Sequence, residues 1–188
     1  TLVGSTINIP LVQLYEPRIA HAAEIDAFGE VYETPTVVDW PGVIIAANVG
    51  GALIPAAMSL YLLLRFGFWG RGLVAVAGVT VLCHALATPV PGLGIALPAL
   101  APGVAAGAAG LLLSRSLAAP IAYVSGSLGT LIGADLLNLG QLQTMGASVA
   151  SIGGAGTFDG VFLSGVIAVT IASLSPFHRG LGAQPRRS

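Results

Sequence analysis

Two aspartates, Asp135 and Asp159, lie inside long apolar stretches in the last third of this chain. Between residues 40 and 177 the only other charged residues are three arginines, each in a break between apolar runs: Arg65, Arg71 and Arg115. A carboxylate at membrane depth costs at least a few kcal/mol, so intramembrane carboxylates usually serve a function. The pair is therefore the first candidate for chemistry.

Two carboxylates on neighbouring spans at the same depth can share one proton and act together as acid and base. This chemistry favours an intramembrane aspartyl-type hydrolase with Asp135 and Asp159 as the catalytic pair. The same carboxylates could instead carry protons or bind cations in an ion- or proton-coupled transporter or channel. Either aspartate could also serve as a helix cap, Asp159 in particular. His84 is expected at a similar depth, where it could ligate a metal or relay protons.

Several uncharged residues could line this site. Asn138 follows Asp135 by three residues on a helix and could donate a hydrogen bond to it. Gly153, Gly154 and Gly156 precede Asp159, and glycines allow backbone conformations with positive φ that can turn N–H groups inward. We therefore expect a Gly-rich segment that could re-enter the membrane before the last span.

Pro98 and Pro102 stand four residues apart in the string ALPALAP and are expected to bend or unwind their helix, opening a path for substrate. The string resembles the proline-alanine-leucine motif of presenilin-type intramembrane aspartyl proteases. Gly133-Ala134-Asp135 similarly approximates the Gly-x-Gly-Asp motif of those enzymes, with Ala in place of the second Gly. In that family the proline motif follows both aspartates, whereas here it precedes them.

Composition identifies the setting in which these residues act. The 188 residues are 55% hydrophobic and 8% charged, with no Lys and 26 Gly, whereas about a quarter of the residues in soluble domains are charged. The mean hydropathy is +0.89. Small residues let membrane helices approach closely. Ser125, Gly129 and Gly133 recur every four residues and should form such a packing ridge.

The expected fold is an all-α transmembrane helical bundle that forms a single domain over residues 1–188. Five apolar segments are long enough to cross a bilayer: Val43–Leu64, Gly72–Thr88, Leu93–Leu113, Leu117–Leu137 and Asp159–Ser175. Residues 15–40 should form an acidic extramembrane loop with a short amphipathic helix at 20–28. The bundle is expected over 43–175 and a basic tail over 176–188. Because the chain starts at Thr1, we expect a sixth span ahead of it.

The arginines predict the orientation. With five spans, the connections that hold Arg65, Arg71 and Arg115 lie on the same side as the basic tail, and positive charge favours the cytoplasm. The acidic loop and both aspartates would then lie toward the outside of the cell membrane. We expect lipid as a partner, a membrane protein or peptide as a substrate of the hydrolase, and a homo-oligomer for a transporter. We expect no nucleic acid and no cofactor.

Three longer strings resemble an uncharacterised prokaryotic membrane family known as domain of unknown function 1614. They are GSTINIPL at Gly4–Leu11, YVSGSLGTLIGADLLNL at Tyr123–Leu139 and SIGGAGTFDGVFLSG at Ser151–Gly165. The resemblance extends over essentially the whole chain and implies an integral membrane protein of a bacterium or archaeon, in the inner membrane. It supplies no activity, but it singles out the segments that hold Asp135 and Asp159.

Overall fold

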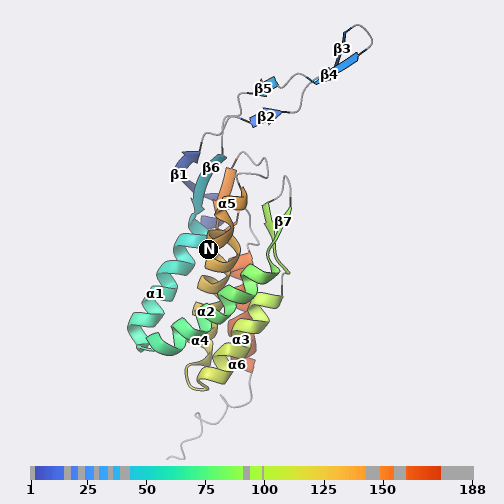
Figure 1. Ribbon diagram of the computed structural model, residues 1–188. Helices are drawn as coiled ribbons and strands as arrows, with labels where there is room; N and C mark the ends of the chain where they lie inside the picture. Colours follow the sequence, from blue (N-terminus) through green and yellow to red (C-terminus); the bar gives the residue numbers. More distant parts are fainter. Residues whose placement is uncertain are drawn as a thin grey trace, which may run out of the picture.

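The computed structural model describes residues 3–14, 18–20, 24–27, 30–33, 36–38, 43–90, 94–98, 100–142, 149–154 and 160–174. A bundle of helices forms one end of the molecule, and strands gather at the other end (Figure 1). The prediction of a helical bundle is confirmed in this broad sense. The strands were not predicted, and they contribute to the site described below.

The bundle consists of α1 (Ile54–Phe66), α2 (Trp69–Leu86), α3 (Ala101–Leu113), α4 (Ala118–Thr130) and α6 (Gly160–Leu174). Successive helices run in opposite directions, so the α1–α2 and α3–α4 connections lie at the same end (Figure 1). One apolar cluster joins both connections, because it contains Leu63 and Phe68 together with Leu113 and Leu117. Arg65, Arg71 and Arg115 therefore lie at this end of the bundle, which we call the arginine end.

Helix α4 is the centre of the bundle and packs against α1, α2, α3 and α6. It continues without a break through a π-helical turn, η3 (Leu131–Asp135), and a 3-10 turn, η4 (Leu136–Asn138), into the short helix α5 (Leu139–Leu142). Most of its side chains are buried, including Ile121 and Val124 with no exposed surface. The fourth predicted span, Leu117–Leu137, therefore coincides with the central element of the fold.

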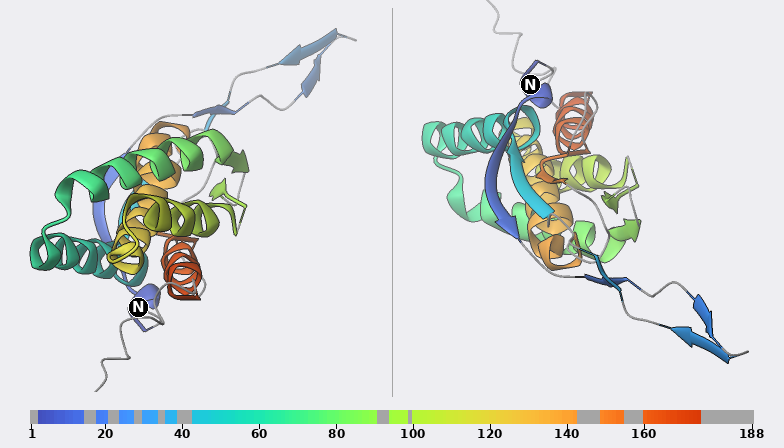
Figure 2. Two further views of the ribbon diagram at one scale, coloured as in Figure 1. Left: turned by 90° about the horizontal axis from the view of Figure 1, so that it is seen from below. Right: turned by 90° about the horizontal axis from the view of Figure 1, so that it is seen from above.

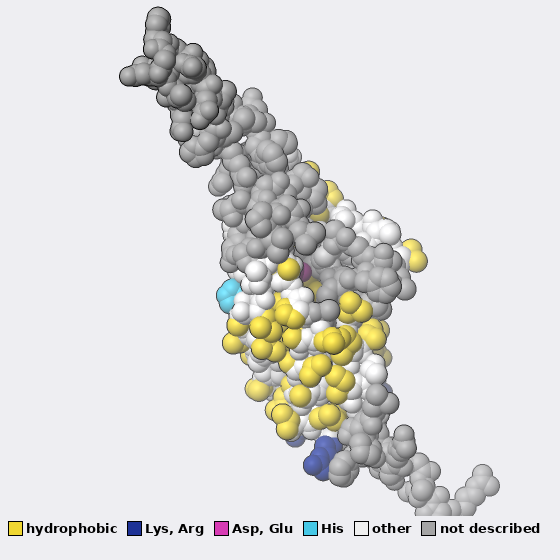
Figure 3. All heavy atoms as spheres, turned by 90° about the vertical axis from the view of Figure 1, so that its right-hand side faces the viewer, with side chains coloured by type: hydrophobic (Ala, Val, Ile, Leu, Met, Phe, Trp, Pro, Cys, Tyr) yellow, Lys and Arg dark blue, Asp and Glu magenta, His cyan; other side chains and the backbone are white. Residues whose placement is uncertain are grey.

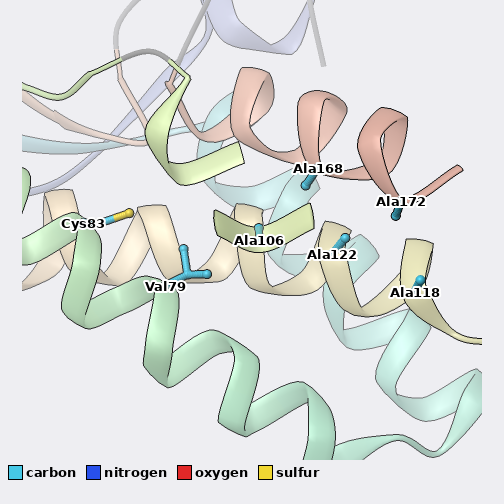
Figure 4. Packing of buried hydrophobic residues seen from close by; sticks show 7 residues of the cluster. All are labelled: Val79, Cys83, Ala106, Ala118, Ala122, Ala168 and Ala172. Atoms are coloured by element: carbon cyan, nitrogen blue, oxygen red, sulfur yellow. The ribbon is translucent and has the colours of Figure 1, made fainter. Parts of the chain in front are cut away.

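Small residues form the interior of the bundle. Seven buried residues from α2, α3, α4 and α6 meet in one cluster (Figure 4): Val79, Cys83, Ala106, Ala118, Ala122, Ala168 and Ala172. The predicted ridge on α4 packs against α2, since a Cβ added at Gly129 would lie 2.7 Å from the Cβ of Val79. A Cβ at Gly133 would collide with the carbonyl oxygen of Thr80. The predicted role of these two glycines is confirmed.

Large apolar side chains cover the outside of the bundle instead. Leu64, Val81 and Leu112 are 66%, 70% and 86% exposed. Figure 3 shows such side chains spread over the bundle surface above the basic side chains of the arginine end. Three helical stretches, Val49–Phe66, Trp69–Leu86 and Ala118–Asn138, are long and apolar enough to cross a membrane. An apolar exterior around a small-residue core is the arrangement expected of a protein surrounded by lipid.

A three-stranded sheet closes the end of the bundle opposite the arginines. Its strand order is β1 (Asn8–Leu14), β6 (Val43–Asn48) and β9 (Val149–Ile152), with β1 antiparallel and β9 parallel to β6. Figure 2 shows β1 and β6 lying side by side along their length. The pairing shifts between Pro10 and Val12, as expected where a proline lacks the N–H that a strand ladder needs. A 3-10 turn, η1 (Gly4–Thr6), precedes β1.

Beyond the sheet the chain forms two further antiparallel pairs in which β2 (Arg18–Ala20) joins β5 (Thr36–Val38) and β3 (Glu24–Ala27) joins β4 (Glu30–Glu33). These nested pairs extend away from the bundle (Figure 1). The amphipathic helix expected at 20–28 is therefore wrong. β-Branched and aromatic residues on the returning side, such as Tyr32 and Val37, favour strand pairing over an isolated helix.

Two predicted spans begin with extended chain in the structure. The helical part of the first span starts only at the π-helical turn η2 (Val49–Leu53), because the preceding residues form β6. The third starts at Ala101, after a hairpin of β7 (Thr88–Val90) and β8 (Gly94–Ala96). Of the two effects expected of Pro98 and Pro102, a bend inside the helix is wrong, whereas unwound chain is confirmed at Pro98, which lies in non-helical chain before α3. Pro102 occupies the first turn of α3. A proline fits there because the first helical N–H groups have no partner within the helix.

Candidate functional site

Asp135 is the last residue of η3, at the end of the bundle that carries the sheet. Its side chain is half-buried. The carboxylate oxygen Oδ2 accepts a hydrogen bond from the backbone N–H of Gly153, with 2.7 Å between nitrogen and oxygen. This bond joins the central helix to the turn that follows β9, two segments that are 18 residues apart in sequence.

The turn that presents this N–H depends on two glycines. Gly153 and Gly154 have φ angles of 85° and 76°, which residues with a Cβ rarely adopt. Gly153 also packs tightly, because an added Cβ would lie 2.6 Å from the carbonyl carbon of Gly51 and 2.8 Å from the Cβ of Ala52. The positive φ expected of Gly153 and Gly154 is confirmed, and the bond from Gly153 N–H to Asp135 is a contact that the sequence did not predict.

A chain of amides and hydroxyls connects this turn to the N-terminal segment. The Oγ of Ser151 lies 2.7 Å from Asn8 Oδ1 and 2.8 Å from the carbonyl oxygen of Gly154. Asn8 Oδ1 also accepts a hydrogen bond of 3.1 Å from Asn48 Nδ2. The three residues come from β1, β6 and β9, so each strand of the sheet contributes one polar side chain.

Asn48 is fully buried and determines how β6 turns into helix. Its Nδ2 donates to the carbonyl oxygen of Ser5 at 2.7 Å, and its Oδ1 accepts from the N–H of Gly51 at 2.8 Å. The second bond caps η2, which supplies a partner for an N–H that the first turn of a helix cannot bond internally. A single side chain thus holds the N-terminal segment and the start of α1 in place.

Asn138 stabilises the helix on which Asp135 lies. Its Nδ2 donates to the carbonyl oxygens of Gly133 and Ala134, both at 2.9 Å. A change from α- to π-helical and then 3-10 turns interrupts the regular backbone ladder, and these donations satisfy carbonyls at that point. Nδ2 of Asn138 also lies 3.4 Å from Nδ1 of His84. The side chain of His84 is exposed.

The predicted site residues thus fall into separate groups. Asp135, Gly153 and Gly154 come together, while Asn138 contacts the helix of Asp135 and the ring of His84. Pro98 and Pro102 lie at the start of α3. Asp159 and Gly156 lie outside the described residues, so the carboxylate pair and the role of its second member stay predictions.

Within the part of the chain that the structure describes, no group of three or more His, Cys, Asp or Glu side chains could hold a metal ion. His84 as a metal ligand stays a prediction. The oxygen-rich part of the site consists instead of Asp135, Asn8, Ser151 and backbone carbonyl groups.

Sequence reasoning missed Asn8, Asn48 and Ser151. Asn48 had a usable signal, because it is a polar side chain within the apolar stretch VIIAANVGGALIP, and such side chains in a membrane segment are usually hydrogen-bonded or functional. Asn8 and Ser151 each lie in one of the strings that carry the family resemblance. Nothing in their spacing indicated that strands would bring them together.

The comparisons with known proteins agree with the resemblance of these strings. A family model described as "Protein of unknown function (DUF1614)" matches residues 2–171. No curated protein and no solved structure matches the chain. The chain therefore belongs to the DUF1614 family. The similarity to presenilin-type proteases is not part of this match.

Proposed function

We propose that this membrane protein moves protons or small cations across the bilayer, as a coupled transporter or a channel, and that Asp135 is its ion-binding carboxylate. The observation that carries the proposal is the hydrogen bond of 2.7 Å from Gly153 N–H to Asp135 Oδ2. This bond holds the carboxylate of Asp135 at the end of the bundle where the apolar helices meet the extended segments.

The form of the backbone at this end supports transport. Three helices of the bundle are preceded by extended segments: β6 leads into η2 and α1, β8 precedes α3, and β9 precedes α6. Non-helical backbone at membrane depth is tolerated only where it is buried in protein or lines a water-filled cavity. In many transporters, such interrupted helices supply the backbone groups that bind substrate and coupling ions.

Helix length points the same way. Helix α3 has 13 residues, which corresponds to about 20 Å at 1.5 Å per residue. A hydrocarbon core is about 30 Å thick. Helix α3 therefore covers only part of a bilayer, and the extended segment that precedes it would complete the crossing.

The chemistry around Asp135 suits a cation or a proton. A carboxylate that accepts a backbone N–H is stabilised in its charged form. The same turn brings neutral oxygen atoms of Ser151 and Gly154 close together. A negative charge beside neutral oxygens is the kind of ligand set that hard cations prefer.

Uptake into proteoliposomes tests this function. Purified protein would be reconstituted, and a pH-sensitive dye and isotopic Na⁺ and K⁺ would follow H⁺ or cation movement driven by each ion gradient in turn. We expect flux above that of protein-free vesicles for at least one of these ions. Flux equal to that of empty vesicles for all three would contradict the proposal.

A second candidate is the aspartyl-type hydrolase with Asp135 and Asp159. Its support is positional: Asp159 immediately precedes Gly160, the first residue of α6, and α6 packs against α4, the helix that continues to Asp135. If Asp159 is catalytic, Asp159→Asn abolishes peptide cleavage in detergent while the protein stays folded. If Asp159 only caps α6, Asp159→Asn is nearly silent and Asp159→Ala costs about 1 kcal/mol of stability.

Placement in the cell follows from the same proposal. The sheet end with Asp135 would face outward from the inner membrane of a prokaryote, and the arginine end and the C-terminal tail would face the cytoplasm. The helices α1, α2, α3, α4 and α6 make a small bundle for a transporter, so a homo-oligomer would supply the complete pathway.

A further inference from the structure

We propose that Asn8, Ser151 and the carbonyl group of Gly154 bind a hard monovalent cation, Na⁺ in the first instance, beside Asp135. The inference rests on the proposed function, because it identifies the place where that function would hold its ion.

The orientation of Asn48 determines that of Asn8. The N–H of Gly51 donates to Asn48 Oδ1 at 2.8 Å, so the other end of the Asn48 amide is the NH₂ group. That group donates to Asn8 at 3.1 Å, and the atom of Asn8 that faces it must therefore be the oxygen. Turning the Asn8 amide over would place two NH₂ groups against each other.

Ser151 then faces two oxygen atoms with only one hydrogen atom. Its Oγ lies 2.7 Å from Asn8 Oδ1 and 2.8 Å from the carbonyl oxygen of Gly154. A hydroxyl group has one O–H to donate, and neither partner oxygen has a hydrogen to offer in return. The two short oxygen–oxygen contacts must therefore share a single hydrogen, which weakens one or both of these bonds.

A cation removes this conflict. Oxygen ligands lie about 2.3–2.6 Å from a hard cation such as Ca²⁺, and at about 2.4 Å two oxygens 2.8 Å apart subtend roughly 70° at the ion. Such an angle is ordinary for six to eight ligands. Hydroxyl, amide and backbone carbonyl oxygens are also the neutral ligands that hard cations take.

The charge at the site selects a monovalent ion. The three ligands are neutral, and the nearby carboxylate of Asp135 is bound to the adjacent residue, Gly153, at 2.7 Å. One negative charge beside neutral oxygens balances a single positive charge. Asn8 is exposed and Ser151 is half-buried, so an ion can enter from the solvent side of the sheet.

Thermal unfolding in detergent tests the site without any transport measurement. The midpoint would be measured while NaCl replaces choline chloride at constant ionic strength. For the wild type we expect a rise that saturates with Na⁺, since a ligand that binds only the folded state stabilises it. Ser151→Ala removes one ligand and should raise the apparent dissociation constant at least tenfold. Thr6→Ala is the matched control, because its exposed hydroxyl bonds to Val3 and lies outside the cluster.

Asn8→Asp gives a second, independent result that does not depend on the folding of Ser151→Ala. It keeps the oxygen that accepts from Asn48 and adds a negative charge, so it should lower the apparent dissociation constant for Na⁺ at least tenfold. A wild-type midpoint that does not change with Na⁺, or a Na⁺ response that Ser151→Ala leaves intact, would overturn the site.

The two proposals fail separately in these experiments. Flux of H⁺ or K⁺ in proteoliposomes without any Na⁺ effect on unfolding would remove the cation site and leave the transport function. A Na⁺ response that depends on Ser151, without flux of any ion, would leave a cation site that holds the sheet together and remove the transport function.

Discussion

At the residue scale, the site depends on side chains that hold backbone segments together. Asn48 joins the N-terminal turn to the start of η2, and Asn138 bonds to carbonyls of η3. Asp135 then bonds to the turn after β9. Each of these side chains lies where a regular helix or strand ends, because backbone groups there have no partner within their own element.

Asn48→Ala should destabilise the protein more than any change of an exposed hydroxyl. It removes the oxygen that accepts from Gly51 N–H in a fully buried setting, and a buried N–H left without a partner costs about 1–3 kcal/mol. Thr88→Ala is the control, because its hydroxyl is exposed and its bond to Leu86 is long, at 3.5 Å. Equal unfolding midpoints of the two variants in detergent would contradict the role given to Asn48.

Asn138→Asp tests the hydrogen bonds donated by the Asn138 amide without changing the size of the side chain. The carboxylate has nearly the same shape as the amide but offers no hydrogen, so it cannot donate to the carbonyl oxygens of Gly133 and Ala134. We therefore expect Asn138→Asp to lower the free energy of unfolding by at least as much as Asn138→Ala, about 1–3 kcal/mol. A stable Asn138→Asp protein, measured by denaturant unfolding at neutral pH, would show that the amide donations contribute nothing.

The sequence predicted part of this site. Asp135 was visible because a charge inside an apolar run is costly, and the positive φ angles of Gly153 and Gly154 followed from the glycine cluster. Asn8 and Ser151 could not be predicted, since 143 residues separate them and only strand pairing brings them together. Asp159 lies outside the described residues, so its role in the site stays a prediction.

At the element scale, helix α4 was predicted well and the ends of other elements were not. The four-residue period of Ser125, Gly129 and Gly133 predicted a close-packing face, and Gly129 and Gly133 do lie against α2. By contrast, Val43–Asn48 was assigned to a membrane helix and is the central strand of the sheet. A short apolar run does not distinguish a buried strand from a helix by its periodicity, and the partners of β6 are distant in sequence.

Gly129→Ala tests the packing of α4 on α2. The new methyl group would lie 2.7 Å from Cβ and Cγ1 of Val79, and overpacking of this kind costs about 1–3 kcal/mol. Gly78→Ala is the matched control on α2, because a Cβ there meets nothing within 4 Å. It should be neutral or stabilising, since alanine is more favourable than glycine inside a helix by about 0.5–1 kcal/mol. Folded yield and unfolding midpoint should fall for Gly129→Ala only.

Gly110 does not serve as a control, although it too lies in an apolar helix, because a Cβ there would collide with the carbonyl oxygen of Ala118. If Gly129→Ala and Gly78→Ala behave alike, α4 and α2 do not pack as closely as this structure has them.

At the scale of the whole molecule, the two ends of the bundle differ in charge and in backbone. The arginine end holds Arg65, Arg71 and Arg115 in or beside short helix connections. The opposite end holds the sheet, Asp135 and the paired strands that extend away from the bundle. A membrane placed across the apolar surface between them would separate these ends. By the positive-inside rule, the arginine end would then face the cytoplasm.

Labelling of single cysteines tests that orientation. Cys83 is buried and would be replaced by Ala before Glu30→Cys, in β4, and Ser116→Cys, between α3 and α4, are introduced separately. We expect a membrane-impermeant maleimide added to intact cells or spheroplasts to label position 30 and not position 116. Equal labelling of both positions in sealed preparations would show that the proposed sidedness is wrong.

The central claim is that the charge of Asp135 is used in ion movement, and Asp135→Asn tests it most directly. The amide oxygen of Asn can still accept the hydrogen bond from Gly153 N–H, so the fold is expected to persist while the negative charge is lost. Flux in proteoliposomes would be normalised to the amount of folded protein, with Thr88→Ala as the control variant. We predict that Asp135→Asn unfolds within a few degrees of the wild type and loses at least 90% of the flux, a tenfold drop equivalent to about 1.4 kcal/mol. A folded Asp135→Asn protein with wild-type flux would contradict the claim.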